Sequence, residues 1–353
     1  MSIADKLATI AENEQKIYHK GKVDWENWSY FFTQGVRSDF IDKLNYSDTS
    51  KGTDFSRMFN NCSSLTTIPE IDTSNGINFN SMFDGCSSLK TIPLIDTSKC
   101  TNFTQLFMNC KALTTVPQLD TSNGENLSSM FYGCTVLKTI PQLNTSKCTN
   151  FTQLFMNCKA LTTVPQLDTN KGTDFATMFG GCSVLKTIPQ LNTSKGTNFS
   201  QMFNNCTALT TVPQLDTSNG IYFSSMFSSC TALTSIPQLD TSNATGFSQM
   251  FYNCKALTTI PKLNVNKVTT FSNAFYNCSA LTNITFEGEI SADINFKQSS
   301  KLTVDSLTSI VNHLKDYSVS SPGKCTLTLH STAKSRLTTE LIDKISNLGW
   351  NLA

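Results

Sequence analysis

Residues 198–218 read Asn-Phe-Ser-Gln-Met-Phe-Asn-Asn-Cys-Thr-Ala-Leu-Thr-Thr-Val-Pro-Gln-Leu-Asp-Thr-Ser, and close variants of this stretch recur along the chain every 24 positions. The spacing is plainest in one column of cysteines: Cys62, Cys86, Cys110, Cys134, Cys158, Cys182, Cys206, Cys230, Cys254 and Cys278. Ten copies of the unit fill residues 53–284 of the 353-residue chain. A fixed period of roughly 20–50 residues is typical of a solenoid, in which stacked units share one apolar core.

Each unit contains two apolar patterns. Phe199, Met202, Phe203 and Cys206 fall at i, i+3, i+4 and i+7, which predicts one face of a short helix with Asn198 as its N-cap. The following Cys-x-x-Leu-x-x-Val-Pro-x-Leu has the spacing of a leucine-rich repeat, and residues 210–212 are expected to form a short strand of a parallel sheet. The proline that follows cannot donate to a sheet ladder, so strand pairing should stop there.

The fold class is therefore predicted as α/β: a leucine-rich-repeat solenoid with a parallel sheet and short helices. Helices need about 10 Å of width and strands about 4.8 Å, so we expect the stack to curve with its strands on the concave side. Two segments flank the solenoid of residues 53–284. Residues 1–52 are predicted to be an N-terminal cap or anchor, with a helix over residues 2–20 and an aromatic cluster of Trp25, Trp28, Tyr30, Phe31 and Phe32. Residues 285–353 are predicted to be a small α/β cap with helices over 304–314 and 339–348, a strand over 325–329 and Gly349 after the last helix.

Charge and cysteine usage exclude several classes. The 27 basic and 26 acidic residues nearly cancel, and no basic stripe is visible, so nucleic acid is not an expected partner. No run reaches the roughly 18 apolar residues of a membrane span, and residues 1–21 lack the apolar region of a secretory signal. The periodic cysteines are expected to be buried, reduced thiols, because they lie on the inward face of each unit. Cys100 and Cys148 occupy another column and are expected to be surface or loop thiols.

Two columns are candidate binding surfaces. The residue after the second phenylalanine changes from unit to unit, and we call this the variable column: Asn60, Asp84, Met108, Tyr132, Met156, Gly180, Asn204, Ser228, Tyr252 and Tyr276. Such a position is expected to be at least partly exposed. Met108, Tyr132, Met156, Tyr252 and Tyr276 are the first candidate contact residues, and a tolerant surface without function is the alternative.

The second candidate is a row on the predicted strands, which we call the threonine row: Thr67, Thr91, Thr115, Thr139, Thr163, Thr187, Thr211, Ser235, Thr259 and Asn283. Thr91 to Thr211 would offer a hydroxyl strip to a glycan or protein, and strand propensity with solvation is the alternative explanation. An ice-binding array would need more than one row.

Catalysis, metal binding and cofactors are not expected. The Asp or Asn before each Thr-Ser pair, such as Asp216, fits turn capping better than stacked calcium ligands. His19, His313 and His330 lie outside the repeats and neighbour no plausible nucleophile. Residues 97–121 and 145–169 are identical at an offset of 48 (145 − 97), which indicates a recent duplication and suits a recognition surface better than an enzyme.

The repeat Met-Phe-x-x-Cys-x-x-Leu-x-x-Ile-Pro-x-Leu-Asp-Thr-Ser resembles the BspA-like leucine-rich repeats of bacterial surface proteins, whose members often bind host matrix or other cells. The start of the chain, residues 1–18, looks like that of structural proteins from phages and prophages of Gram-positive gut bacteria. The end, residues 302–353, is similar to a module that closes such phage proteins.

These resemblances imply a non-catalytic phage tail protein that presents its repeats for host recognition. Its partners would be a host surface protein or glycan and, through the N-terminal segment, other virion proteins or further copies of the chain. The alternatives are a BspA-like adhesin on the bacterial cell surface and, third, an accessory binding module. The missing secretion signal favours the virion.

Overall fold

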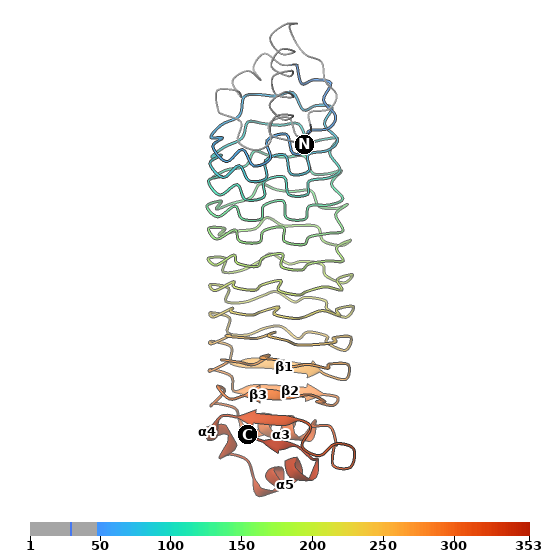
Figure 1. Ribbon diagram of the computed structural model, residues 1–353, viewed down its shortest axis with the longest axis vertical. Helices are drawn as coiled ribbons and strands as arrows, with labels where there is room; N and C mark the ends of the chain where they lie inside the picture. Colours follow the sequence, from blue (N-terminus) through green and yellow to red (C-terminus); the bar gives the residue numbers. More distant parts are fainter. Residues whose placement is uncertain (1–28, 30–47) are drawn as a thin grey trace, which may run out of the picture.

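The computed structural model describes residue 29 and residues 48–353, which form a column of stacked rungs (Figure 1). Each rung corresponds to one repeat unit, because equivalent residues 24 positions apart form parallel bridges, for example Asp174 with Asn198 and Asn198 with Tyr222. The described chain is therefore a repeat solenoid, as the sequence predicts. The predicted N-terminal helix and aromatic cluster lie outside the described residues.

The Phe-Met-Phe-Cys part of each unit is not a helix, and this part of the prediction is wrong. No helix occurs among the described residues 48–303. Backbone N–H groups instead alternate between two acceptors. Those of Phe199, Gln201 and Phe203 donate to the next rung, to Tyr222 O, Ser224 O and Met226 O, each at 2.9 Å. The N–H groups between them close turns within the rung, as Met202 N does to Phe199 O at 3.2 Å.

Two left-handed residues in each rung prevent a helix. In the rung of residues 197–220 they are Gln201 and Asn205, with φ of 57° and 59°. The second position is occupied mainly by residues that adopt this conformation readily: Asn61, Gly85, Asn109, Gly133, Asn157, Gly181, Asn205, Ser229, Asn253 and Asn277. A single helix of two turns is marginal by itself, whereas this backbone bonds each rung to its neighbour. Asn198 still caps the segment, since its Oδ1 accepts from Ser200 N at 3.1 Å, but it caps a turn.

The reason given for the predicted curvature, wide helices opposite narrow strands, does not apply, because the described residues 48–303 contain no helix. Both sides of the column are held at hydrogen-bond distance between adjacent rungs. On the turn side Phe59 N donates to Met82 O at 2.9 Å, and on the strand side Thr114 N donates to Lys90 O at 3.0 Å. Hydrogen bonds between adjacent rungs therefore occur on both sides of the stack of rungs in Figure 1.

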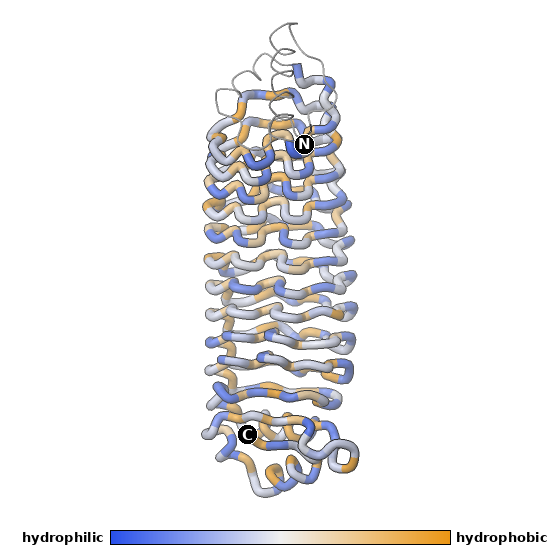
Figure 2. Tube along the Cα trace, in the orientation of Figure 1, coloured by the Kyte–Doolittle hydropathy of each residue, from blue (hydrophilic) through white to orange (hydrophobic). Residues whose placement is uncertain are grey.

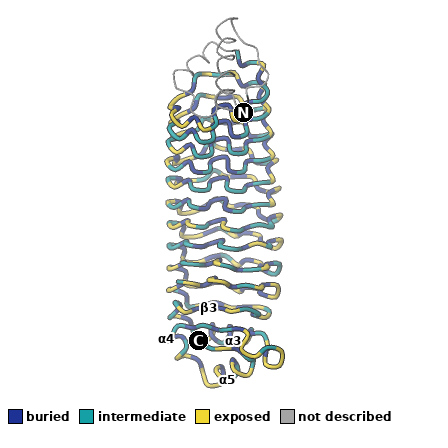
Figure 3. The backbone as a smooth tube through the Cα atoms, in the orientation of Figure 1, coloured by how far each residue is buried: buried dark blue, intermediate teal, exposed yellow. Residues whose placement is uncertain are grey.

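The core is a set of ladders that run along the column. Figure 2 shows apolar segments recurring at matching places in successive rungs, and Figure 3 shows that these segments are buried. One phenylalanine of each rung joins an unbroken stack with ring centroids 5.5–6.0 Å apart: Phe59, Phe83, Phe107, Phe131, Phe155, Phe179, Phe203, Phe227, Phe251 and Phe275. Each such ring is fully buried, so the ladder binds neighbouring rungs through apolar contact.

The periodic cysteines lie beside this stack as buried free thiols, which confirms their predicted burial. Cys206 Sγ donates to the carbonyl of Phe179 in the preceding rung at 3.1 Å. Cys100 and Cys148 are also fully buried, so their predicted surface position is wrong. Other rungs have glycine at this position, and a Cβ on Gly76 would collide with the buried ring of Phe79. The column therefore faces the core.

Regular strands are rare on the strand side. Among the described rungs, only β1 (Thr259–Asn264) and β2 (Asn283–Glu287) pair there as parallel strands, with a register shift between Ile260 and Leu263 around Pro261. Between earlier rungs the backbone makes few bonds here, such as Thr210 N to Lys186 O at 3.1 Å. The proline column explains this, because each proline removes a ladder donor, as predicted.

Side chains replace the missing backbone bonds. The Nε2 of Gln190 donates to the carbonyl of Gln214 in the next rung at 2.7 Å, and the other repeat glutamines do the same. The hydroxyl of buried Thr193 donates to Asp216 O at 2.8 Å, and this bond also recurs along the column. These two ladders hold the corner of the rung that follows the proline.

The chain ends in a small unit after the repeats. Three short strands, β3 (Ile294–Phe296), β4 (Thr326–Leu329) and β5 (Asn351–Leu352), form a parallel sheet in the order β3-β4-β5. Helices α3 (Val304–Asn312), α4 (Ser331–Lys334) and α5 (Thr339–Asn347) accompany it. The structure confirms the two predicted helices and adds α4, and Gly349 follows α5 with φ of 73°. Phe296 stacks on Phe275 at 4.7 Å, which joins this unit to the phenylalanine ladder.

Candidate binding surfaces

The variable column lies at the edge of the core, where most of its side chains are half-buried. Its predicted partial exposure is confirmed for the five candidate residues, and Tyr276 has 37% of its surface exposed. The small members Gly180 and Ser228 are buried. The column therefore carries two apolar patches, Met108–Tyr132–Met156 and Tyr252–Tyr276, with three small or polar residues between them.

The backbone fixes the direction of these side chains. Tyr252 stands between the left-handed residues Gln249 and Asn253, with φ of 56° and 60°, and its N–H closes a turn to Gln249 O at 3.0 Å. Asn253 N donates to the carbonyl of Tyr276 in the next rung at 2.7 Å. The two tyrosine rings consequently stack, with centroids 5.3 Å apart and an interplanar angle of 9°.

Polar members of the variable column interact with one another. Asn60 Nδ2 donates to Asp84 Oδ2 at 3.1 Å, and burial raises the pKa of the Asp84 carboxyl. This end of the column is thus closed by internal hydrogen bonds, whereas Met108, Tyr132 and Met156 present apolar surface.

The threonine row is exposed in every rung, in agreement with its predicted position on the strand side. The hydroxyls of Thr91, Thr115, Thr139, Thr163, Thr187 and Thr211 make no hydrogen bond with the described residues. The preceding residue behaves differently, since the hydroxyl of Thr114 donates to Lys90 O at 3.1 Å. The row therefore offers free hydroxyls, and the adjacent threonines support the backbone.

The turn carboxylates are structural. Asp216 Oδ1 accepts from Ser218 N at 3.1 Å and from Ser218 Oγ at 2.7 Å, and these bonds lower the pKa of Asp216. The same bond to the backbone recurs at Asp72, Asp96, Asp120, Asn144, Asp168, Asn192, Asp240 and Asn264. Turn capping is confirmed. No group of three His, Cys, Asp or Glu side chains among the described residues could hold a metal ion.

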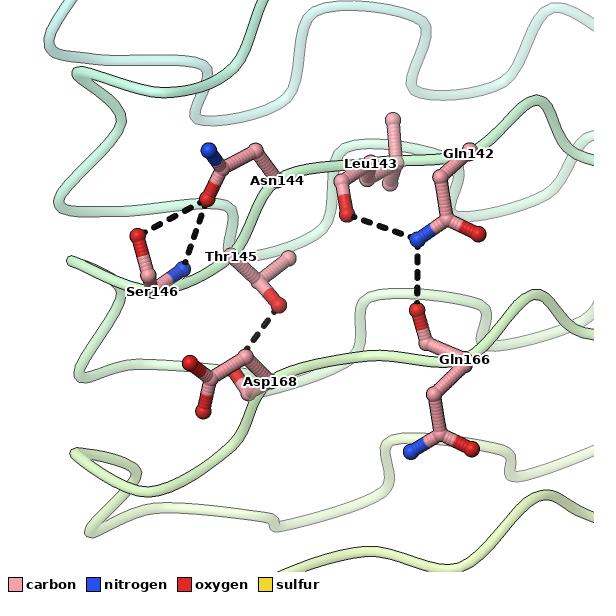
Figure 4. A pocket seen from close by; sticks show the side chains of 7 residues that line it. All are labelled: Gln142, Leu143, Asn144, Thr145, Ser146, Gln166 and Asp168. Atoms are coloured by element: carbon pink, nitrogen blue, oxygen red, sulfur yellow. Dashed lines mark hydrogen bonds between the residues drawn. The ribbon is translucent and has the colours of Figure 1, made fainter.

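In a shallow hollow beside these turns, the polar side chains that line it donate hydrogen bonds to carbonyls of the same hollow (Figure 4). Gln142 Nε2 donates to Leu143 O at 3.1 Å and to Gln166 O at 2.7 Å, and Thr145 Oγ1 donates to Asp168 O at 2.8 Å. The hollow is a by-product of the side-chain ladders and presents few unused donors to a ligand.

The groups that could have been nucleophiles or bases have structural roles. Burial raises the pKa of the Cys206 thiol to about 12, so it stays protonated and is a poor nucleophile. His313 Nδ1 lies 2.7 Å from Ser309 O in the last turn of α3, and His330 Nδ1 accepts from Thr332 N as the N-cap of α4. His19 lies outside the described residues.

The sequence interpretation missed two features. The buried threonines of the Asp-Thr-Ser segments bond to the next rung, whereas the sequence pattern indicates only local turn bonds for these segments. Their column is interrupted only at Val265, an apolar substitution that could have indicated burial. The glutamine ladder was visible as a row at Gln118, Gln142, Gln166, Gln190, Gln214 and Gln238.

Stacked rungs that carry exposed columns of side chains along their length define the class of this protein, which is a repeat solenoid. The chain belongs to the family described as "Mycoplasma protein of unknown function, DUF285", whose model matches overlapping segments 26–139, 87–188, 125–214 and 173–287. No curated protein matches the chain.

Several solved structures are distantly similar. A leucine-rich cell surface protein from Faecalibacterium prausnitzii is 20% identical, with 72% of this chain and 78% of that chain covered and a TM-score of 0.35. A leucine-rich-repeat protein from Bacteroides ovatus is 18% identical, with coverage of 72% and 82% and a TM-score of 0.35. An internalin from Listeria monocytogenes is 14% identical, with coverage of 82% and 83% and a TM-score of 0.29.

None of the helices in the described part of the chain is long and apolar enough to cross a membrane.

Proposed function

We propose that this chain is a non-catalytic adhesion protein that binds a protein or glycan on a cell surface through the side of its solenoid. The variable column carries this proposal. It places half-exposed methionine and tyrosine side chains above a core that barely changes from rung to rung. Aromatic side chains combine a large apolar area with little conformational freedom to lose, which favours them as contact residues.

The two apolar patches suit a ligand that follows the column. Met108, Tyr132 and Met156 occupy three successive rungs, and Tyr252 and Tyr276 occupy two further rungs. Gly180, Asn204 and Ser228, which lie between the two patches, have smaller side chains than the methionines and tyrosines. A ligand side chain or sugar could occupy the space above them. The threonine row, with its free hydroxyls, is the second contact surface in this proposal.

The setting we propose is the bacterial cell surface. The phage-tail interpretation rested on the two ends of the chain, and the comparisons lend it no support. Protease treatment of intact cells, followed by mass spectrometry of released peptides, should recover this chain. Its recovery from purified virions, and its absence from the cell surface, would contradict the setting while leaving the binding proposal to its own test.

Binding is tested with purified protein on intact target cells. Replacement of Tyr132, Tyr252 and Tyr276 by alanine should weaken binding by about tenfold or more, because buried contact tyrosines commonly contribute more than about 1 kcal/mol each. The thermal midpoint should remain nearly unchanged. Alanine at Ile77, Tyr222 and Val319, which are exposed elsewhere, is the matched control and should bind like the wild type.

A second variant separates binding from folding. Tyr132→Asn, Tyr252→Asn and Tyr276→Asn introduce a residue that the column already carries at Asn60 and Asn204. Unchanged binding by this folded variant would contradict the proposal, and so would equal loss of binding by the control.

A further inference from the structure

Five lysines line the strand side of five successive rungs, and we call them the lysine strip: Lys90, Lys111, Lys138, Lys159 and Lys186. All five are exposed. They alternate between two columns. Lys111 and Lys159 directly follow a periodic cysteine, and Lys90, Lys138 and Lys186 lie four positions after one. The expectation that the chain has no basic stripe is therefore wrong, because the stacking of rungs brings together lysines that lie 21 or 27 positions apart (111 − 90 and 138 − 111).

The backbone of each lysine is fixed by the next rung. Lys138 O accepts from both the N–H and the hydroxyl of Thr162, at 3.0 and 3.1 Å. Lys111 O accepts from the hydroxyl of Thr135 at 3.2 Å. The alternation also places Thr or Ser above and below each lysine within its own column, which reduces repulsion between neighbouring charges.

Nothing on this side of the described rungs neutralises the strip. The segments from the residue after each periodic cysteine to the proline, such as 87–93, 111–117 and 135–141, contain no Asp or Glu. The strip lysines form no ion pair with the described residues, and the pairs Lys262–Glu287 and Lys315–Glu289 lie beyond the strip. The turn carboxylates follow the proline along the rung and bind their own turns.

We propose that the lysine strip binds a linear anionic polysaccharide that lies along the solenoid. With rungs about 4.8 Å apart, the five lysines extend over roughly 19 Å, a length that a polymer with repeated sulfate or carboxylate groups can follow. Free hydroxyls of the threonine row lie on the same rungs and can bond to sugar hydroxyls. Thr91, Thr139 and Thr187 directly follow a strip lysine, and Thr115 and Thr163 lie four positions after one.

Side-chain chemistry favours a polysaccharide over a nucleic acid. The segments that carry the strip contain neither an aromatic residue nor an arginine. Single-stranded nucleic acids are commonly held by aromatic stacking platforms and arginine, which this surface lacks. The strip is a different surface from the variable column, so this inference goes beyond the adhesion proposed above.

The test measures binding of the full chain to immobilised heparin, used as a sulfated polysaccharide, over a range of salt concentrations. Lys111→Thr, Lys138→Thr and Lys159→Thr together insert the residue that each column already carries in other rungs, as at Thr135, Thr114 and Thr207. We expect at least about tenfold weaker binding at 0.1 M salt and a smaller dependence on salt, since screened charge pairs would be lost.

The matched control removes the same charge elsewhere. Lys147→Asn, Lys171→Asn and Lys195→Asn alter a column that carries asparagine at Asn123 and Asn219. It should retain nearly wild-type heparin binding, and both variants should keep the wild-type thermal midpoint. Lys138→Thr alone, with an expected loss of about twofold to fivefold, covers the case in which the triple variant does not fold.

Several results would overturn the inference. These are wild-type binding no weaker to uncharged dextran than to heparin, tighter binding to single-stranded DNA than to heparin, or an equal loss in the control. The tyrosine variants of the adhesion test should bind heparin like the wild type, because they leave the lysine strip unchanged. The two proposals can therefore fail independently.

Discussion

The hydroxyl of Thr193 donates a hydrogen bond of 2.8 Å to the backbone carbonyl of Asp216, which lies in the next rung. Thr193 is 1% exposed, so this bond is shielded from water. It lies in the turn that follows the proline, four positions after Pro189 (193 − 189), and it repeats along the column. The rungs at this corner are therefore held by a side chain whose loss leaves a carbonyl without a partner.

Replacement of Thr193 by valine should lower the free energy of unfolding by about 1–3 kcal/mol, the usual cost of an unsatisfied buried polar group. Thr193→Ser keeps the hydroxyl and should lower it less. Chemical denaturation of both variants checks this. Equal stability of the valine variant and the wild type would show that the ladder contributes nothing.

Phe203 lies within the phenylalanine stack, 5.7 Å from the ring of Phe179 and 5.5 Å from that of Phe227. Phe203→Ala should lower the free energy of unfolding by about 3–5 kcal/mol. The substitution leaves a cavity, and the hydrogen-bonded rungs on both sides limit how far the core can relax to fill it. Tyr222→Ala, on the exposed surface, is the control and should stay within about 0.5 kcal/mol of the wild type. Similar values for the two variants would contradict the ladder.

Asn205 has φ of 59°, and glycine takes its place at Gly85, Gly133 and Gly181. Asn205→Gly should therefore be nearly neutral, whereas Asn205→Val should lower the free energy of unfolding by about 1–3 kcal/mol, because a β-branched residue is strained there. Helix formation at this segment would reverse the order, since glycine would then be the more damaging substitution. Denaturation of the two variants separates the alternatives.

The buried thiols predict both slow labelling and a stability that depends on pH. Burial raises the pKa of Cys206 to about 12, whereas an unfolded cysteine titrates near about 8.5. Folded and unfolded chains bind the proton equally below pH 8.5, so this contribution is intact there. Between about 8.5 and 12 only the unfolded chain releases it, so the free energy of unfolding falls as pH rises.

Thiol reagents at pH 8 should therefore reach few of the periodic cysteines until denaturant is added. Denaturation at pH 8 and pH 10 should show a larger loss of stability for the wild type than for Cys206→Ala, which lacks one titrating thiol. Rapid labelling of most cysteines in the native protein would contradict their burial.

The period, the core residues and the turn caps could be predicted from the sequence, because each depends only on which residue types recur. The backbone path could not. Phe199, Met202, Phe203 and Cys206 have helical spacing, but left-handed Gln201 and Asn205 give the same inward side chains without a helix. The choice between the two is made by hydrogen bonds between rungs, which no single unit contains.

The surfaces show the same limit. Tyr276 could be placed at the edge of the core because its column also accepts Asn and Asp. The lysine strip could not be seen from a net charge of +1, because Lys111 and Lys138 become neighbours only when rungs stack. Thr193 and Thr187 are the same residue type, and the sequence alone does not separate their roles. The rung geometry buries Thr193, which bonds to the next rung, and leaves Thr187 exposed as a candidate contact residue.

The adhesion proposal is tested most directly by oxidative footprinting of the purified chain, free and bound to target cells. Binding should protect Met108, Tyr132, Met156, Tyr252 and Tyr276 from oxidation, while the exposed loop at Val319 reacts as before. Protection confined to residues 285–353, or no change along the variable column, would contradict binding through the side of the solenoid.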